Sequence, residues 1–245
     1  SKLFPLFGTY DPALSNTTYM RSVWQKVTHA ADKHNQPGQF TAFIGYEWTS
    51  FGDLSADVSK ASNLHRVVIF KDSADKANQI LPFSAFDSPD PEHLWQFLEK
   101  YQQLADGEVL AIPHNGNTSR GKMFAPVDYQ LRPLSRGYAK NRSRWEPLYE
   151  TTQIKGDSET HPILSPNDEF SDFETWSSWA GKTQGNIKDP DTIEKKRSEY
   201  ARSGLKLGLD QHAKLGVNPF KFGMIGSTDS HTSLATADDN NYMGK

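Results

Sequence analysis

The chain has 245 residues, of which 36% are hydrophobic and 12% aromatic, a composition typical of a folded domain with long polar loops rather than a disordered chain. Its formal net charge is −3, from 27 basic and 30 acidic residues, so nothing suggests a nucleic-acid partner. It contains no cysteine, which excludes disulfide frameworks, thiolate metal sites and cysteine nucleophiles. No apolar run approaches the length of a membrane span, and no signal peptide is visible.

Three segments show the periodicity of amphipathic helices. The first covers residues 17–35, where Tyr19, Val23 and Val27 recur every four residues. Similar patterns predict helices over residues 91–104 and 193–216.

Short apolar runs alternate with these helices and predict strands. An α/β fold with a mainly parallel sheet, in a single domain over residues 1–245, is the arrangement that this alternation favours. The predicted strands are residues 40–46, 66–70, 109–113, 148–154 and 222–226.

A long irregular stretch covers residues 156–192 and combines many acidic residues with four aromatic ones. Loops of this length are often lids or binding loops. The stretch is interpreted as a loop insertion, either a lid at the mouth of a site or a surface insertion packed on its own domain.

Metal-ligand residue types fall at the ends of the predicted strands. Glu47 follows the first strand, His114 the third, and Asp229 and His231 the fifth. Parallel strands gather their carboxyl ends at one edge, so these side chains are expected in one cluster. His65 is the exception, because it precedes its strand.

Histidine and carboxylate without cysteine suit zinc, manganese or iron of the hydrolytic kind. In an extended chain, the side chains of Asp229 and His231 would point the same way. His161 is a further candidate, as a ligand, a general acid or a loop staple, and Glu159 is a possible replacement ligand. The four remaining unassigned histidines lie on predicted helices or helix ends and are interpreted as structural: His29, His34, His93 and His212.

Several polar side chains near these strand ends are candidates to hold an anionic substrate. Arg66, Lys155 and a turn-rich loop after His114 supply them, although that loop is equally typical of an ordinary exposed loop. No Walker or Rossmann glycine loop and no Gly-x-Ser-x-Gly elbow is present. The candidates in the loop are Asn115, Arg120 and Lys122.

Five segments resemble a bacterial family known only as a domain of unknown function, which is itself similar to the PHP (polymerase and histidinol phosphatase) group of metal-dependent phosphoesterases. The resemblance covers nearly the whole chain. The segments are Gly45–Thr49, Asn63–Val68, Ile112–Asn117, Gln153–Pro162 and Asn218–His231.

The resemblance implies a PHP-like, distorted β/α barrel with a metal cluster at the carboxyl ends of its strands. Glu47 would be the bridging carboxylate, His65 and His114 ligands from successive strands, and Asp229 and His231 the final pair. It also implies a small anionic ester as substrate and favours a periplasmic or secreted location. PHP proteins begin with a His-x-His motif, which this sequence lacks, so we expect a fragment of a longer chain with weak metal retention.

The function expected from the sequence is a metal-dependent, phosphoesterase-like hydrolase that uses metal-activated water. Asp229 and His231 would assist proton transfer. The alternative is a non-catalytic module that binds a ligand or a metal at a degenerate site. A carbohydrate-binding protein is a third interpretation, suggested by six tryptophans and polar loops. It ranks below the other two because the tryptophans show no shared spacing.

Overall fold

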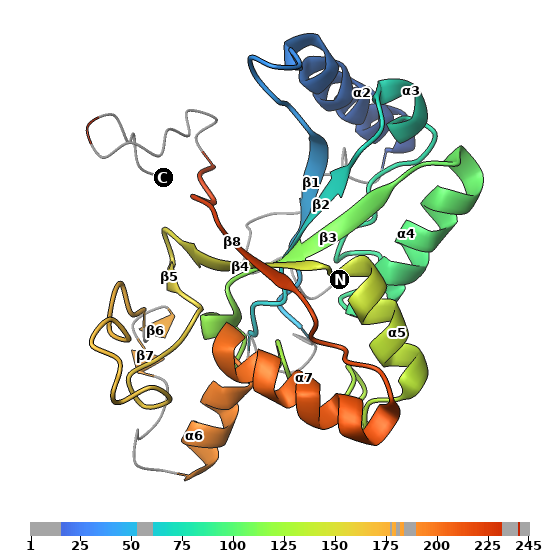
Figure 1. Cartoon of the computed structure of the whole chain (residues 1–245). Helices are drawn as coiled ribbons and strands as arrows, with labels where there is room; N and C mark the ends of the chain where they lie inside the picture. The colour runs from blue at the N-terminus through green and yellow to red at the C-terminus, as the bar shows by residue number, and fades with distance from the viewer. Residues whose placement is uncertain are drawn as a thin grey trace. The chain divides into compact units, whose positions relative to one another are not determined.

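The computed structural model of the chain describes residues 16–52, 61–176 and 190–231, together with residues 178–179, 182–183 and 240. The chain forms two compact units (Figure 1). Unit 1 comprises residues 1–112 and 144–146, and unit 2 comprises residues 113–143 and 147–245. Across the described residues, no helix is both long enough and apolar enough to cross a membrane.

The predicted barrel is wrong. The described strands form three separate sheets, with the orders β1-β2-β3, β5-β4-β8 and β6-β7. The expectation of a mainly parallel sheet is also wrong, because β1 runs antiparallel to β2 and β4 runs antiparallel to β5, while β4 and β8 run parallel. A β/α barrel needs a crossover helix between successive strands, whereas β4 folds straight back into β5 through a turn at Ile154–Lys155. The fold is mixed α/β with two small three-stranded sheets.

The described part of unit 1 contains one sheet and three whole helices, and two of these helices begin at clear caps. The Asn16 side chain accepts a hydrogen bond from the Tyr19 N–H, and Asp90 does the same for Glu92 just before Pro91. Figure 1 shows β1, β2 and β3 side by side, with α2 next to α3. The elements are α2 (Thr17–His34), β1 (Ile44–Trp48), β2 (Arg66–Phe70), α3 (Ala74–Ala77), α4 (Pro91–Ala105) and β3 (Val109–Pro113), whose last residue opens unit 2.

The core of unit 1 is aromatic, and it reverses the expected face of the first helix. The rings of Trp24 and Phe70 lie 5.8 Å apart, and Tyr101 meets Phe70 edge-on at 4.9 Å. On α2 it is Trp24 that is buried, while Tyr19 and Val23 of the predicted apolar row are exposed. One large indole therefore places the helix, against the periodicity of the smaller side chains.

Unit 2 contains the second sheet, and its long C-terminal helix is two helices rather than one. The chain is extended at Tyr200, and the N–H groups of Ala201 and Arg202 donate to the carbonyls of Ser158 and Glu159. The break satisfies two N–H groups that the first turn of a helix leaves unpaired. The elements are η3 (Gly116–Thr118), α5 (Arg136–Trp145, ending in unit 1), β4 (Leu148–Gln153), β5 (Gly156–Asp157), β6 (Ser178–Trp179), β7 (Lys182–Thr183), α6 (Pro190–Arg197), α7 (Ala201–Leu215) and β8 (Gly223–Gly226).

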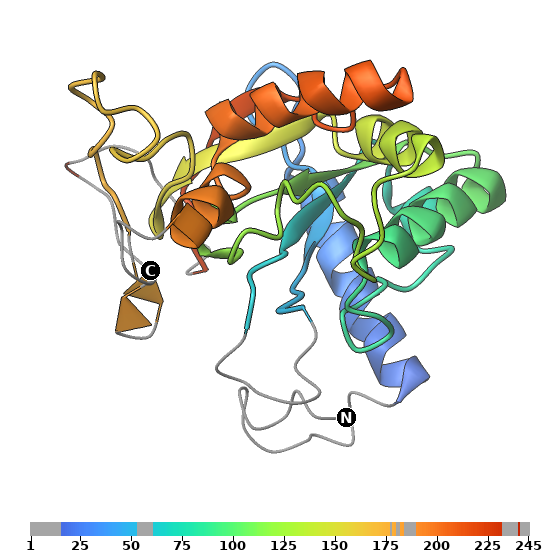
Figure 2. The ribbon, with the colours of Figure 1, turned by 90° about the horizontal axis from the view of Figure 1, so that it is seen from below.

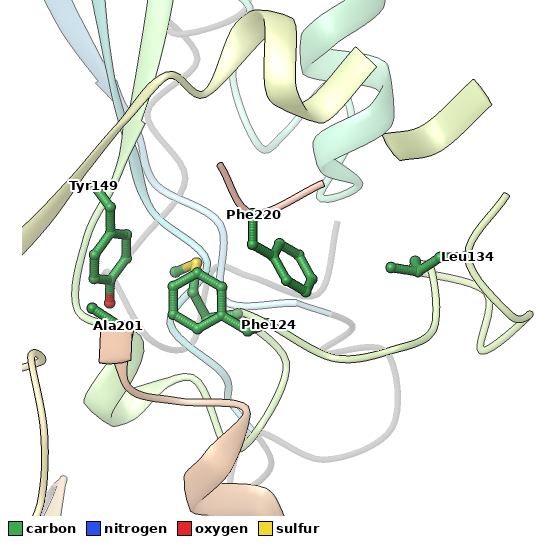
Figure 3. Close-up of a cluster of buried hydrophobic side chains, with 6 residues drawn as sticks. Phe124, Leu134, Tyr149, Ala201 and Phe220 are labelled. Atoms are coloured by element: carbon green, nitrogen blue, oxygen red, sulfur yellow. The ribbon is translucent and has the colours of Figure 1, made fainter. Parts of the chain in front are cut away.

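Figure 2 shows α7 alongside β4, and a compact hydrophobic cluster packs residues of both together (Figure 3). Phe124 meets Tyr149 and Phe220 edge-on, with ring centroids 5.0 and 5.4 Å apart. The Arg142 guanidinium lies 4.6 Å from the centre of the Phe220 ring, close enough for a cation–π contact. This cluster fixes β4, whose carboxyl end carries the polar network described below.

The predicted loop of residues 156–192 contains more structure than expected. It begins as β5, continues in turns to residue 176, includes the β6–β7 pair, and ends in the first turn of α6. Arg202 of α7 pairs with Glu159 at 2.7 Å and with Asp168 at 2.5 Å, which ties the turns to the body of unit 2. The role of a lid stays a prediction, and residues 177, 180–181 and 184–189 lie outside the described residues.

Candidate metal-binding residues

In unit 1, the antiparallel pairing of β1 and β2 brings Glu47 and His65 together. The register sets Trp48 opposite Arg66 and Glu47 opposite Val67, so His65 is a diagonal neighbour of Glu47 on the same face. His65 Nδ1 lies 2.8 Å from Glu47 Oε1. His65 therefore reaches the end of β1 although it precedes its own strand, which a parallel sheet could not explain.

The environment of this pair fixes the imidazole. His65 is buried, and the ring of Phe51 packs edge-on against it at 4.7 Å. Its backbone N–H donates to the side chain of Asn63. The carboxylate of Glu47 is partly exposed, at 26%, so solvent and ions have access to the pair.

In unit 2, Asp229 and His231 meet just beyond β8. Asp229 Oδ1 lies 3.3 Å from His231 Nε2. The backbone at Asp229 is left-handed, with φ 50°, so the chain is not extended there, and the two side chains meet across the intervening Ser230. The Asp229 side chain is 9% exposed and that of His231 is 52% exposed.

The separations inside the two pairs fit coordination of a divalent ion. Nitrogen and oxygen ligands lie about 2.0–2.2 Å from zinc, so two ligands of one ion are about 2.8–3.6 Å apart at octahedral or tetrahedral angles. The two ligand atoms are 2.8 Å apart within the Glu47–His65 pair and 3.3 Å apart within the Asp229–His231 pair. Each unit thus presents a histidine–carboxylate pair whose ligand atoms could share an ion. His114 is fully buried in unit 2, and the convergence of all five residues in one cluster stays a prediction.

A hydrogen-bonded network surrounds Asp229 and includes Gln153, which was missed from the sequence. Gln153 Nε2 donates to Asp229 Oδ2 at 2.8 Å and to Asn115 Oδ1 at 2.7 Å. Lys155 forms an ion pair with the same oxygen of Asp229. Oδ2 is thus occupied by two donors, which leaves Oδ1, on the side of His231, for an ion. Gln153 is the last residue of β4, and Glu47 is the second-last residue of β1. This shared position at a strand end is the sequence signal that could have identified Gln153 as a site residue.

Two of the other substrate candidates are exposed and one is buried. Arg120 and Lys122 lie on an exposed turn, whereas Arg66 is 1% exposed. Arg66 Nε donates to Glu146 Oε1 at 3.0 Å, and the guanidinium also donates to the carbonyl of Leu64. These contacts give Arg66 a structural role inside unit 1.

His161 and Glu159 also have structural partners in unit 2. His161 is buried, its Nδ1 accepts a hydrogen bond from the Ile163 N–H at 3.2 Å, and its ring lies 5.5 Å from that of Tyr200. Burial, assisted by the positive charge of Lys196, lowers the pKa of His161 to about 4. Two of the four histidines interpreted as structural have hydrogen-bond partners close in sequence. His29 contacts the carbonyl of Gln25, and His93 contacts the hydroxyl of Ser88.

We expect His161 to make unit 2 less stable in acid. Its folded pKa lies below the unfolded value of about 6.5, so the unfolded chain takes up the proton first as the pH falls. Stability should therefore fall between about pH 6.5 and pH 4, by at most about 1.4 kcal/mol per pH unit. His161→Asn keeps an acceptor for the Ile163 N–H but does not titrate, and urea unfolding of this variant should show a flatter acid limb. His212→Asn, at an exposed position of α7, is the control, and an unchanged slope in His161→Asn would contradict the expectation.

The fold and these side chains together define a mixed α/β protein with histidine–carboxylate pairs of metal-binding geometry. The family model described as "Protein of unknown function (DUF3604)" matches residues 8–245, so the chain belongs to this family. No curated protein matches the chain. No solved structure matches it either.

Proposed function

We propose that the chain is a metal-dependent hydrolase domain that acts on small anionic esters, phosphoesters first among them. One observation carries the proposal: within each histidine–carboxylate pair, Glu47–His65 in unit 1 and Asp229–His231 in unit 2, the two ligand atoms have the separation of ligands that share an ion. Glu47 lies near the end of β1 with His65 beside it, and Asp229 and His231 lie just beyond β8. The resemblance of the motifs to PHP phosphoesterases supports the ester class.

The donor set fits zinc, manganese or iron, since imidazole and carboxylate are present and thiolate is absent. Such an ion supplies a Lewis acid and lowers the pKa of water, which is the chemistry that ester hydrolysis requires. Asp229 would hold the ion through one oxygen only, because Lys155 and Gln153 occupy the other.

The polar groups around Asp229 suit an anionic substrate. Lys155 supplies a nearly buried positive charge, and the fully buried Asn115 amide supplies a donor. In a site of low dielectric, such groups attract a negative oxygen more strongly than they would in water. Asp229 and His231 are also the groups placed to accept or return a proton.

The contact between Lys155 and Asp229 favours one second candidate, a metal- or ligand-binding module without turnover. The ammonium takes a carboxylate oxygen that a second ion would otherwise use. Hydrolysis, measured separately from metal binding, distinguishes the two functions.

The test is a phosphoesterase assay on the metal-free chain after addition of Zn²⁺, Mn²⁺ or Fe²⁺, with p-nitrophenyl phosphate and its diester as probes. We expect metal-dependent release of nitrophenol that falls at least about 100-fold in Asp229→Asn and His65→Asn, because each variant removes a metal ligand. His212→Asn is the matched control and should retain the activity. Metal binding without turnover would support the binding module and contradict the hydrolase.

A further inference from the structure

We infer that Gln153 is a positioning residue: it turns the Asn115 amide so that its N–H group donates to a negative oxygen of the bound ester or of its phosphate product. This inference deepens the proposed function and rests on it. It is argued from unit 2 alone, where Asn115, Gln153 and Asp229 form one hydrogen-bonded network; Gln153 is the last residue of β4 and Asp229 lies just beyond β8.

The orientation of the Gln153 amide follows from its neighbours. The backbone N–H of Lys155 can only donate, and it lies 2.7 Å from Gln153 Oε1. The Asp229 carboxylate accepts, and its Oδ2 lies 2.8 Å from Gln153 Nε2. Both contacts fix the same end of Gln153 as the oxygen, so no other assignment satisfies them.

The orientation of Asn115 then follows from that of Gln153. Because Gln153 presents its NH₂ group at 2.7 Å, Asn115 must present its oxygen. Its own NH₂ group is turned away from Gln153. Gln153 thus works as a relay, since the polarity of one backbone N–H sets the polarity of the asparagine amide.

The NH₂ group of Asn115 is a donor without an acceptor. Asn115 is fully buried, and among the described residues no hydrogen-bond partner reaches its Nδ2. A buried donor left unpaired costs about 1–3 kcal/mol. The residue also has φ 55°, in the left-handed region, a second local cost at the same position. An anionic oxygen from a ligand would satisfy this donor, and Lys155 adds positive charge to the same network.

The sheet holds the relay in place beyond the end of β4. The Ser227 N–H donates to the Thr152 carbonyl at 3.1 Å, and the Ile154 N–H donates to the Thr228 carbonyl at 3.4 Å. These bonds flank Gln153 on both sides and keep it beside the segment after β8 that carries Asp229. The Gly116 N–H, next to Asn115, donates to the Tyr149 hydroxyl at 3.0 Å and anchors the other end of the relay.

The substitution Gln153→Glu reverses the relay. A carboxylate at this position cannot donate a hydrogen bond, and its negative charge repels Asp229. The Asn115 side chain gains a hydrogen bond by turning its NH₂ group toward residue 153. The donor is then withdrawn from the substrate oxygen while the side-chain volume is kept. Asn115→Asp removes the same donor but leaves an oxygen for Gln153, and Gln153→Met removes the relay without adding charge.

The experiment follows the side-chain NH₂ signals of the full chain by ¹⁵N–¹H NMR during titration with inorganic phosphate, with and without Zn²⁺. The Asn115 pair of signals is identified by its loss in Asn115→Asp. We expect phosphate to shift this pair in the wild-type chain and not in Gln153→Glu or Gln153→Met. We also expect the Kd for phosphate to rise about 10–100-fold in both variants, the loss of one hydrogen bond to a charged group.

The backbone amide spectrum reports whether each variant is folded, and Gln130→Glu, at an exposed turn of unit 2, controls for the added charge. Wild-type Asn115 signals that ignore phosphate would overturn the inference, as would Gln153 variants that bind phosphate with wild-type affinity. Shifted Asn115 signals in a chain that hydrolyses no ester would keep the inference and remove the hydrolase. Ester hydrolysis with KM and kcat unchanged in Gln153→Met would keep the hydrolase function and contradict the positioning role of Gln153.

Discussion

Replacing Glu146 by alanine is expected to lower the free energy of unfolding by about 3–5 kcal/mol, the usual cost of breaking a buried ion pair by removing one partner. Glu146 Oε1 accepts from Arg66 Nε at 3.0 Å and from Trp95 Nε1 at 2.9 Å. The side chains of Glu146 and Arg66 are both 2% exposed. The variant would leave a buried guanidinium without its carboxylate and would remove an acceptor of the Trp95 indole N–H, and urea unfolding measures the loss.

Glu108→Ala is the matched control for Glu146→Ala. Glu108 also pairs with a basic residue of unit 1, Lys71, but the two side chains are 65% and 72% exposed. Exposed pairs contribute little, because water and salt screen them. Equal losses in the two variants would show that burial is not what makes the Arg66–Glu146 pair important.

Replacing Gly116 by alanine is expected to destabilise unit 2 by about 3 kcal/mol, at the upper end of the usual cost of overpacking. A Cβ at this position would lie 2.2 Å from the Tyr149 hydroxyl oxygen and 2.3 Å from the Glu199 carbonyl oxygen. The second obstacle is backbone and cannot rotate away. Because Gly116 follows Asn115, the shift should also weaken phosphate binding, and both effects are measured on the same variant.

Gly137→Ala is the control for the loss of a glycine. Its added Cβ would meet nothing nearer than the Ser135 hydroxyl at 3.6 Å, an ordinary contact. Gly137 lies in α5, where alanine is the better helix former, so a gain of up to about 1 kcal/mol is expected. A similar loss of stability in both variants would contradict the steric account of Gly116.

The sequence predicted elements better than it predicted their arrangement. The strands at residues 66–70 and 109–113 and the helices that begin at residues 17 and 91 were placed correctly, because local periodicity and caps determine them. The sheet direction was wrong, because β1 and β2 are joined by a loop whose length fits either a hairpin or a crossover. The break at Tyr200 was also missed, since it depends on carbonyls of Ser158 and Glu159 about forty residues away.

For the candidate site, the residue types identified candidates, but the sequence could not show which residues are in contact. The sequence singled out Glu47 and His65, and the antiparallel register explains why a histidine that precedes its strand meets the carboxylate. From its sequence position, Arg66 was an equally good candidate to bind an anionic substrate. Its actual partner is Glu146, which lies 80 residues further along the chain and could not be recognised from the sequence. Gln153 carries no charge and has no distinctive motif, so only its contacts reveal it.

The account rests on metal binding by the two histidine–carboxylate pairs, and equilibrium dialysis against Zn²⁺ or Mn²⁺ tests it most directly. The wild-type chain and His212→Asn should bind at least one ion, whereas His65→Asn and Asp229→Asn should each lower the affinity at least about 10–100-fold. Each ligand variant should lose the ion that its own pair holds. A wild-type chain that retains no metal, or ligand variants that bind as the wild type does, would contradict the account.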